Sequence, residues 1–118
     1  MASVEPAARP PYDKEGIYVK DRTMYVVGTR YAAKVSRALA SDTRARIIEV
    51  LQSGPADLDT IAERVGQSKA NVSSQVRILE DVGIVKPIYM PGQRGIKKII
   101  ELQVDRIFIY LTVETVQQ

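Results

Sequence analysis

The chain has 118 residues, 45% of them hydrophobic, and a formal net charge of +3, with no cysteine and no histidine. These values predict one compact domain with a tail, and they exclude disulfides, thiolate metal sites and the commonest nitrogen ligand and general base. The sequence has neither an apolar run of about 18 residues for a membrane span nor the apolar core of a secretory signal. We therefore expect a cytoplasmic protein that is not an enzyme and that uses no metal or other cofactor.

The N-terminal part of the chain predicts an arm, a hairpin and a helix. Residues 1–15 contain three prolines and little apolar content, which predicts a flexible arm, and residues 16–116 are expected to form one domain. Two short apolar runs within residues 17–27 flank a polar tetrapeptide and predict a β-hairpin. Thr29 is expected to cap a helix from about Arg30 to Ala40. One face of this helix, with Tyr31 and Val35, could close the domain or meet a second subunit. A basic stripe on another face could be solvated or lie along phosphates, and we expect it to be solvated.

Residues 41–85 predict three short amphipathic helices. Gly54-Pro55, Gly66 and Gly83 are expected to end the three helices, and Ser68 is placed to cap the third. Apolar residues recur at helical spacing in each helix, so the three stripes can close into a small core. The stripes are Ile47, Val50 and Leu51, then Leu58, Ile61, Ala62 and Val65, then Val72, Val76, Leu79 and Val82.

The residues that follow change to a strand-like pattern. Two β-runs flank Pro91-Gly92-Gln93-Arg94-Gly95 and predict a hairpin with a positively charged tip. We interpret the three helices before it as containing a helix-turn-helix. A hairpin that directly follows this motif is a wing, here at about residues 84–103. The segment at about 104–116 is nearly continuously apolar and β-branched, which favours a strand, although Ile107, Phe108 and Leu111 also fit a helix. An apolar strand in so small a chain needs cover, so this segment is expected to form a dimer contact.

The third helix, at about 68–82, is the predicted recognition helix. Residues 68–98 hold six basic residues against Glu80 and Asp81, which suits a surface that faces a polyanion. Asn71 and Gln75 lie four apart on the outward face, and either amide can pair bidentately with adenine in the major groove. The expected DNA-binding residues of this helix are Ser68, Lys69, Ala70, Asn71, Ser73, Ser74, Gln75 and Arg77.

Arg94, at the tip of the wing between two glycines, is expected to enter a narrow minor groove. Lys97 and Lys98 are candidates for phosphate contacts, and since neighbours on a strand point to opposite faces, one of the two is expected to face DNA. The expected wing residues are Gln93, Arg94, Lys97 and Lys98, and the expected dimer contacts are Tyr31, Val35, Ile107, Ile109, Leu111 and Val113.

Several segments resemble the ArsR-like winged helix-turn-helix regulators over about residues 30–103. The resemblance rests on Ala38–Ile48, Leu58, Ile61–Gly66, Val72-Ser73 and Leu79–Val85. It implies an α+β fold with a three- to four-helix core and a β-hairpin wing, here with a short N-terminal β-hairpin and a C-terminal strand added. It also implies a homodimer that binds palindromic operators, and it suggests an archaeal or archaeal-viral source.

Two departures from that family qualify the resemblance. Its metal-sensing members use cysteines, or carboxylates with histidines, and this chain has neither cysteine nor histidine, so it resembles a non-metal-sensing member. Gln75-Val76 also stands where the family usually has histidine and leucine.

The leading hypothesis is therefore a homodimeric repressor that binds double-stranded DNA sequence-specifically and is nucleoid-associated, with no recognisable effector site. The alternatives are an architectural DNA-binding protein without sequence preference and a winged helix used as a protein-interaction module.

Overall fold

The computed structural model of the chain describes residues 9–113. By their internal contacts the described residues divide into two compact units, which we describe separately: a terminal unit (residues 9–36 and 104–113) and a central unit (residues 37–103). The elements in chain order are β1 (Gly16–Lys20), β2 (Thr23–Val27), α1 (Thr29–Leu39), α2 (Asp42–Gln52), β3 (Ala56–Asp57), α3 (Leu58–Val65), α4 (Lys69–Val82), β4 (Val85–Gly92), β5 (Gly95–Leu102) and β6 (Arg106–Tyr110).

The three predicted helices of the central unit are present as α2, α3 and α4, and local chemistry fixes where each one begins. Ser41 Oγ, Asp57 Oδ1 and Ser68 Oγ accept hydrogen bonds from the backbone N–H groups of the first turns of α2, α3 and α4, at 3.2, 2.8 and 3.1 Å. These contacts satisfy donors that a helix start otherwise leaves unpaired. Gly66, with a φ of 70°, ends α3 in the left-handed region that glycine adopts without strain.

The apolar stripes of these helices form the core of the central unit. Burying a branched aliphatic side chain contributes about 1.5 to 3 kcal/mol, so this set supplies most of the force that holds the helices to the sheet. The buried residues are Ile47, Leu51, Ile61, Ala62, Val65, Val72, Val76, Leu79 and Val82 of the helices, with Ile84, Val85, Ile100 and Leu102 after them.

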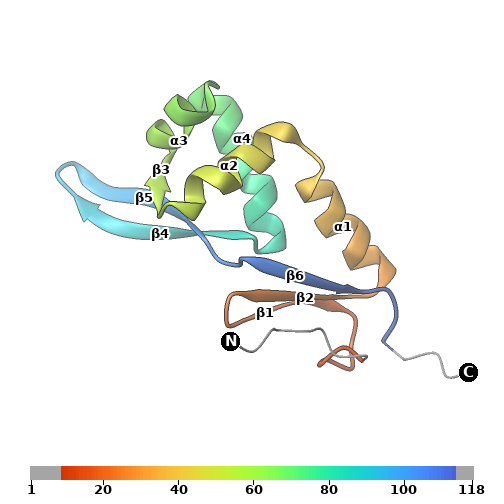
Figure 1. Cartoon of the computed structure of the whole chain (residues 1–118). Coiled ribbons are helices and arrows are strands. Elements are labelled where there is room, and N and C mark those ends of the chain that lie inside the picture. The colour runs from red at the N-terminus through yellow and green to blue at the C-terminus, as the bar shows by residue number, and fades with distance from the viewer. Residues whose placement is uncertain (1–8, 114–118) are drawn as a thin grey trace, which may run out of the picture. The chain divides into compact units, whose positions relative to one another are not determined.

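The predicted wing is the antiparallel pair β4 and β5, to which the short β3 adds on the far side of β5. The pairing runs from Val85 opposite Leu102 to Gly92 opposite Gly95, so the turn itself is only Gln93-Arg94. Figure 1 shows the β4–β5 hairpin extending beyond α2, α3 and α4.

The terminal unit contains a three-stranded sheet of order β1-β2-β6, in which β1 is antiparallel and β6 parallel to β2. The N-terminal hairpin and the C-terminal strand expected from the sequence are thus both confirmed, and they pair with each other. The register places Tyr18, Tyr25 and Phe108 side by side on one face.

The β1–β2 turn is held in an unusual conformation. Asp21 and Arg22 have φ values of 52° and 60°, which asparagine and glycine adopt more readily. Asp105 holds this turn, because its N–H donates to the Arg22 carbonyl at 2.9 Å and its carboxylate lies 3.3 Å from Arg22 Nε. The side chains of Arg106 and then Arg22 hydrogen-bond this carboxylate and lower the pKa of Asp105.

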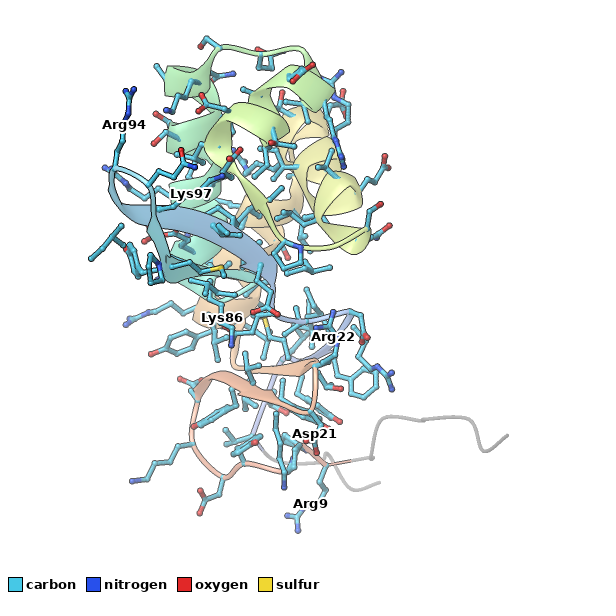
Figure 2. All side chains as sticks on the ribbon, turned by 90° about the vertical axis from the view of Figure 1, so that its left-hand side faces the viewer. Arg9, Asp21, Arg22, Lys86, Arg94 and Lys97 are labelled. Carbon is cyan, nitrogen blue, oxygen red and sulfur yellow. The ribbon has the colours of Figure 1, made fainter. Side chains whose placement is uncertain are left out.

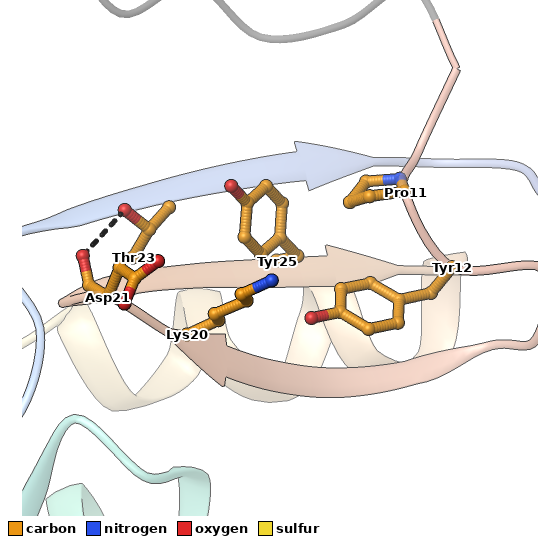
Figure 3. Close-up of a pocket in the computed structure, with 6 residues that line it drawn as sticks. All are labelled: Pro11, Tyr12, Lys20, Asp21, Thr23 and Tyr25. Carbon is orange, nitrogen blue, oxygen red and sulfur yellow. Dashed lines mark hydrogen bonds between the residues drawn. The ribbon is translucent and has the colours of Figure 1, made fainter.

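Part of the expected N-terminal arm packs on this sheet. The Tyr12 ring stacks on Tyr18 with centroids 3.8 Å apart and planes 3° from parallel. Pro11, Tyr12 and Tyr25 then line a groove of about 330 Å³ whose other walls are Lys20, Asp21 and Thr23 (Figure 3). Residues 1–8 of the arm lie outside the described residues.

Within residues 9–113, no helix has the length and apolarity needed to cross a membrane. The same residues contain no group of three or more acidic, histidine or cysteine side chains placed to hold a metal ion.

The start of α3 provides a pH-dependent test of the central unit. The Thr60 N–H, then the Lys97 ammonium at 3.0 Å, lower the pKa of Asp57 from its ordinary value of 3.8 to about 2. A carboxyl whose pKa falls on folding stabilises the protein above its unfolded pKa and loses that contribution as the pH falls through the folded value. We expect Asp57→Asn, which keeps a capping side chain, to lower the free energy of unfolding by about 1 to 2 kcal/mol at pH 7.

Urea unfolding measured from pH 7 to pH 2 checks this expectation. The difference between the Asp57→Asn variant and the unchanged protein should shrink as the pH falls from about 4 to about 2. Asp59→Asn, whose side chain is 73% exposed, is the matched control and should cost no more than about 0.5 kcal/mol. A difference for Asp57→Asn that stays constant with pH would contradict the assignment.

Candidate nucleic-acid interface

The burial of α4 decides which of its side chains can meet a ligand. Val72, Val76 and Leu79 are buried, so the residues between them point outward. Of the eight predicted recognition residues, Ser68, Lys69, Ala70, Ser74 and Arg77 are exposed, and Asn71, Ser73 and Gln75 are half-buried.

Arg44 of α2 is the centre of the polar contacts behind this face. Its Nε donates to the Ala38 carbonyl at 2.7 Å and its Nη2 to the Arg37 carbonyl at 3.0 Å, which satisfies acceptors at the C-terminal end of α1. Its Nη1 donates to Gln75 Oε1 of α4. One guanidinium therefore joins the C-terminal end of α1 to α4.

The chain of hydrogen bonds continues along α4. Gln75 Nε2 donates to Asn71 Oδ1 at 3.3 Å, and Asn71 Nδ2 donates to Gln67 Oε1 at 3.1 Å. A guanidinium has no acceptor, so Arg44 forces Gln75 to present its oxygen, and this choice fixes the orientation of each amide that follows. Asn71 keeps one free N–H and one free acceptor position, which is the pair that adenine requires.

Two other polar side chains of α4, those of Lys69 and Ser74, make weaker contacts at the surface. Lys69 Nζ lies 3.3 Å from Asp59 Oδ1 of α3, and both side chains are more than half exposed. Ser74 Oγ donates back to the Ala70 carbonyl at 3.2 Å. An exposed ion pair of this kind contributes little to stability, so a phosphate can compete for the lysine.

The wing lysines are held by carboxylates of the central unit. Lys97 and Lys98 lie on opposite faces of the hairpin, opposite Met90 and Tyr89 in the register. Lys97 Nζ is 3.0 Å from Asp57 Oδ2, and Lys98 Nζ is 3.2 Å from Glu80 Oε1 of α4.

Gln93 and Arg94 are exposed at the tip, and Figure 2 shows Arg94 extending from the turn. Among residues 9–113, neither Arg94 nor Arg77 makes an ion pair or a hydrogen bond through its side chain, so both guanidinium groups are available to a ligand.

The predicted dimer contacts differ widely in exposure. Val35 is completely buried in the chain itself, so its side chain belongs to the core and is not offered to a second copy. Ile109 and Leu111 are 43% and 61% exposed, whereas Tyr31, Ile107 and Val113 are half-buried. Residues 114–116 of the expected dimer segment lie outside the described part of the chain.

Sequence reasoning missed the role of Arg44. In the sequence, Arg44 stands out only as part of the Ala38–Ile48 segment that carries the family resemblance. Its contacts to Arg37, Ala38 and Gln75 join residues as many as 31 positions apart in the chain, a distance that local periodicity does not reveal.

Comparisons with known proteins agree with this geometry. Residues 39–88 match the family model described as a helix-turn-helix domain. A homodimeric winged helix-turn-helix DNA-binding domain from Mycobacterium bovis, described as a possible ArsR-family transcriptional regulator, superposes with a TM-score of 0.54 at 24% identity, covering 61% of this chain and 63% of that one. The central unit is a winged helix-turn-helix domain.

Two further similarities concern the winged helix-turn-helix region. The chain is 32% identical over 73 residues to the HTH-type transcriptional regulator NmtR of Mycobacterium tuberculosis, covering 59% of this chain and 61% of NmtR. YodB from B. subtilis in its diamide-treated form gives a TM-score of 0.55 at 25% identity, covering 63% of this chain and 72% of that one. These relatives are bacterial, so they give no support to the archaeal or archaeal-viral source that the resemblance suggested.

The Arg44 contacts predict a specific loss of stability. Arg44→Ala leaves two carbonyls of the α1 end and Gln75 Oε1 without their charged donor, so we expect the free energy of unfolding to fall by about 1 to 3 kcal/mol. Arg46→Ala removes an exposed arginine of the same helix and should change it by less than about 0.5 kcal/mol. The free energy of unfolding of both variants is measured by urea unfolding. An equal decrease for the two variants would show that the Arg44 contacts stabilise the protein no more than an exposed arginine does.

Proposed function

We propose that the chain is a sequence-specific regulator of transcription that binds double-stranded DNA, with α4 in the major groove and the β4–β5 hairpin at the minor groove. One observation carries the proposal: the exposed polar half of α4, oriented through Arg44, belongs to the same compact unit as a hairpin whose tip presents Arg94, which has no partner within residues 9–113. In this fold, the outward face of the recognition helix meets base edges and the wing meets the adjacent groove or backbone.

Each group has a distinct role in this proposal. Asn71 reads a base, and Gln75 orients Asn71 and offers its remaining donor and acceptor to the neighbouring base. Lys69, Ser73, Ser74 and Arg77 contact phosphates or base edges, and Ser68 and Ala70 let the N-terminal turn of α4 approach the groove closely. Gln93, Arg94 and one of the two wing lysines make the wing contacts. We assign this role to Lys98, which lies on the hairpin face toward α4 and would exchange Glu80 for a phosphate, whereas Lys97 lies on the opposite face.

The comparisons support membership of the ArsR-like regulators, and from this we infer a repressor that works in the cytoplasm on the nucleoid. The chain spans 61% of NmtR, so this role is carried over from the shared region alone. Because the sequence has no cysteine and no histidine, we also infer that it does not sense metals through thiolate or imidazole ligands, and we assign it no enzymatic activity.

The second copy of a homodimer is inferred to join through the terminal unit. β6 is at the edge of its sheet, and Ile109 and Leu111 on and just after this strand are exposed apolar side chains. An exposed strand edge with apolar side chains is a favourable surface for a second chain. The similarity to a homodimeric winged helix-turn-helix domain supports a homodimer, and the choice of β6 as its interface rests on the exposed apolar side chains alone.

The dimer proposal predicts that Ile109→Ser with Leu111→Ser converts the protein to a monomer. Serine at these two positions removes apolar surface that association would bury. Sedimentation at micromolar concentration measures the oligomeric state, and circular dichroism of the same variant shows whether the fold is kept. A folded variant that remains dimeric, or a natural chain that is monomeric, would overturn this interface.

Selection of bound duplexes from random DNA tests the main proposal. We expect the unchanged chain to enrich one motif, and we expect Asn71→Ala to lose preference at one base position at a cost of about 1 to 3 kcal/mol. Gln52→Ala removes an exposed amide at the end of α2 and is the matched control, which should leave the motif unchanged.

The same selection separates the two alternatives. Binding that weakens with salt but enriches no motif would favour an architectural DNA-binding protein. Absence of duplex binding at low salt would favour a winged helix used for protein interaction.

A further inference from the structure

The outer end of the wing carries apolar side chains that the central unit does not cover. Ile96 is 78% exposed, Tyr89 62% and Met90 47%, and Pro91 is exposed beside them. Among the described residues, Ile96 is the most exposed large apolar side chain. A soluble protein rarely gathers such residues on one projecting element without a partner for them.

The strand register assigns these side chains to two faces of the hairpin. Residues paired across the two strands lie on the same face of the hairpin. One face therefore carries the pairs Tyr89–Lys98 and Pro91–Ile96. The buried Ile100 and Leu102 lie on this same face nearer the core. Lys98 contacts Glu80 of α4, which shows that this is the face toward the recognition helix. Met90 shares the opposite face with Lys97.

The positive charge around this end of the hairpin indicates that its partner is a nucleic acid. The stretch from Lys86 to Ile100 contains four basic residues and no acidic one, and Arg94 at its tip has no partner among the described residues. An apolar protein surface would gain nothing from this charge, whereas a nucleic-acid groove offers phosphates at its rims and deoxyribose C–H groups along its walls.

The last pair of the hairpin carries no side chains. Gly92 and Gly95 face each other at the last pair of the ladder, and a Cβ added at Gly92 would lie 3.3 Å from the Gly95 carbonyl oxygen. The paired strands are too wide for the minor groove of B-DNA, which is about 6 Å wide, so the Arg94 side chain is the part of the tip that can enter it while the end of the hairpin stays at its rim.

We propose that Tyr89, Pro91 and Ile96 form an apolar wedge on the helix-facing side of the wing that packs against the deoxyribose walls of the DNA minor groove while Arg94 reaches into it. This inference rests on the proposed DNA-binding function and assigns the wing a contact that does not depend on charge. Apolar side chains are known to serve as wedges in minor-groove recognition, and their contribution releases no counterions.

The salt dependence of affinity separates the wedge from the charged contacts. The probe is a duplex recovered by selection, and its dissociation constant is measured at several salt concentrations. We expect Ile96→Ser to weaken binding about fivefold to tenfold at every salt concentration, with the slope of log affinity against log salt unchanged. Arg94→Gln should weaken binding and make that slope shallower by about one.

Met90→Ser is the matched control, because it replaces an exposed apolar residue of the same hairpin on the opposite face. It should change affinity by less than about twofold. Thermal melting of all three variants verifies that the fold is intact, as expected for side chains this exposed.

Three outcomes would overturn the wedge. Ile96→Ser could bind as tightly as the unchanged chain, Met90→Ser could weaken binding equally, or Ile96→Ser could change the oligomeric state without changing DNA affinity, which would make the patch a protein contact. If the unchanged chain binds no duplex at all, the proposed function itself fails, and that result is distinct from these three.

Discussion

The hydrogen bonds of Arg44 are the constraint on which the proposed recognition surface depends. The guanidinium satisfies two carbonyls at the end of α1 and, through Gln75, sets the orientation of Asn71. The apolar stripe of α4 only determines which side of that helix faces out, and it leaves each amide free to rotate. A donor-only group behind the helix removes that freedom, so the surface is ordered before any ligand arrives.

The charges of the central unit are less available than their number suggests. Lys69, Lys97 and Lys98 each lie within 3.3 Å of a carboxylate oxygen, so any phosphate that binds one of them would have to replace a partner that is already present. Arg77 and Arg94 carry no such cost. Basic residues that look equivalent in the sequence therefore fall into two groups: the two arginines, which have no carboxylate partner among the described residues, and the three lysines, which do. In the proposed DNA complex, the two arginines should contribute most of the electrostatic part of the binding free energy.

Much of the fold could be predicted from the sequence because its signals are local. Ser68 and Gly66 mark helix ends through contacts within a few residues, and the change from helical to alternating apolar spacing after Gly83 locates the wing. The parallel pairing of β6 with β2 could not be predicted, since it joins residues about 80 positions apart. The same limit hid the contact of Arg44 with Gln75 and the carboxylate partners of Lys97 and Lys98. It also left open whether the helix face with Val35 closes the domain or meets a second subunit, and in the structure Val35 is buried. The roles of the recognition and wing residues remain predictions.

Backbone amide shifts recorded by NMR as duplex DNA is added would test most directly whether α4 and the wing form the DNA-binding surface. The largest changes are expected at Lys69 to Arg77 and at Tyr89 to Lys98, with smaller ones in the β1-β2-β6 sheet. Changes confined to the sheet around Tyr18, Tyr25 and Phe108, with α4 and the β4–β5 turn unaffected, would contradict this assignment.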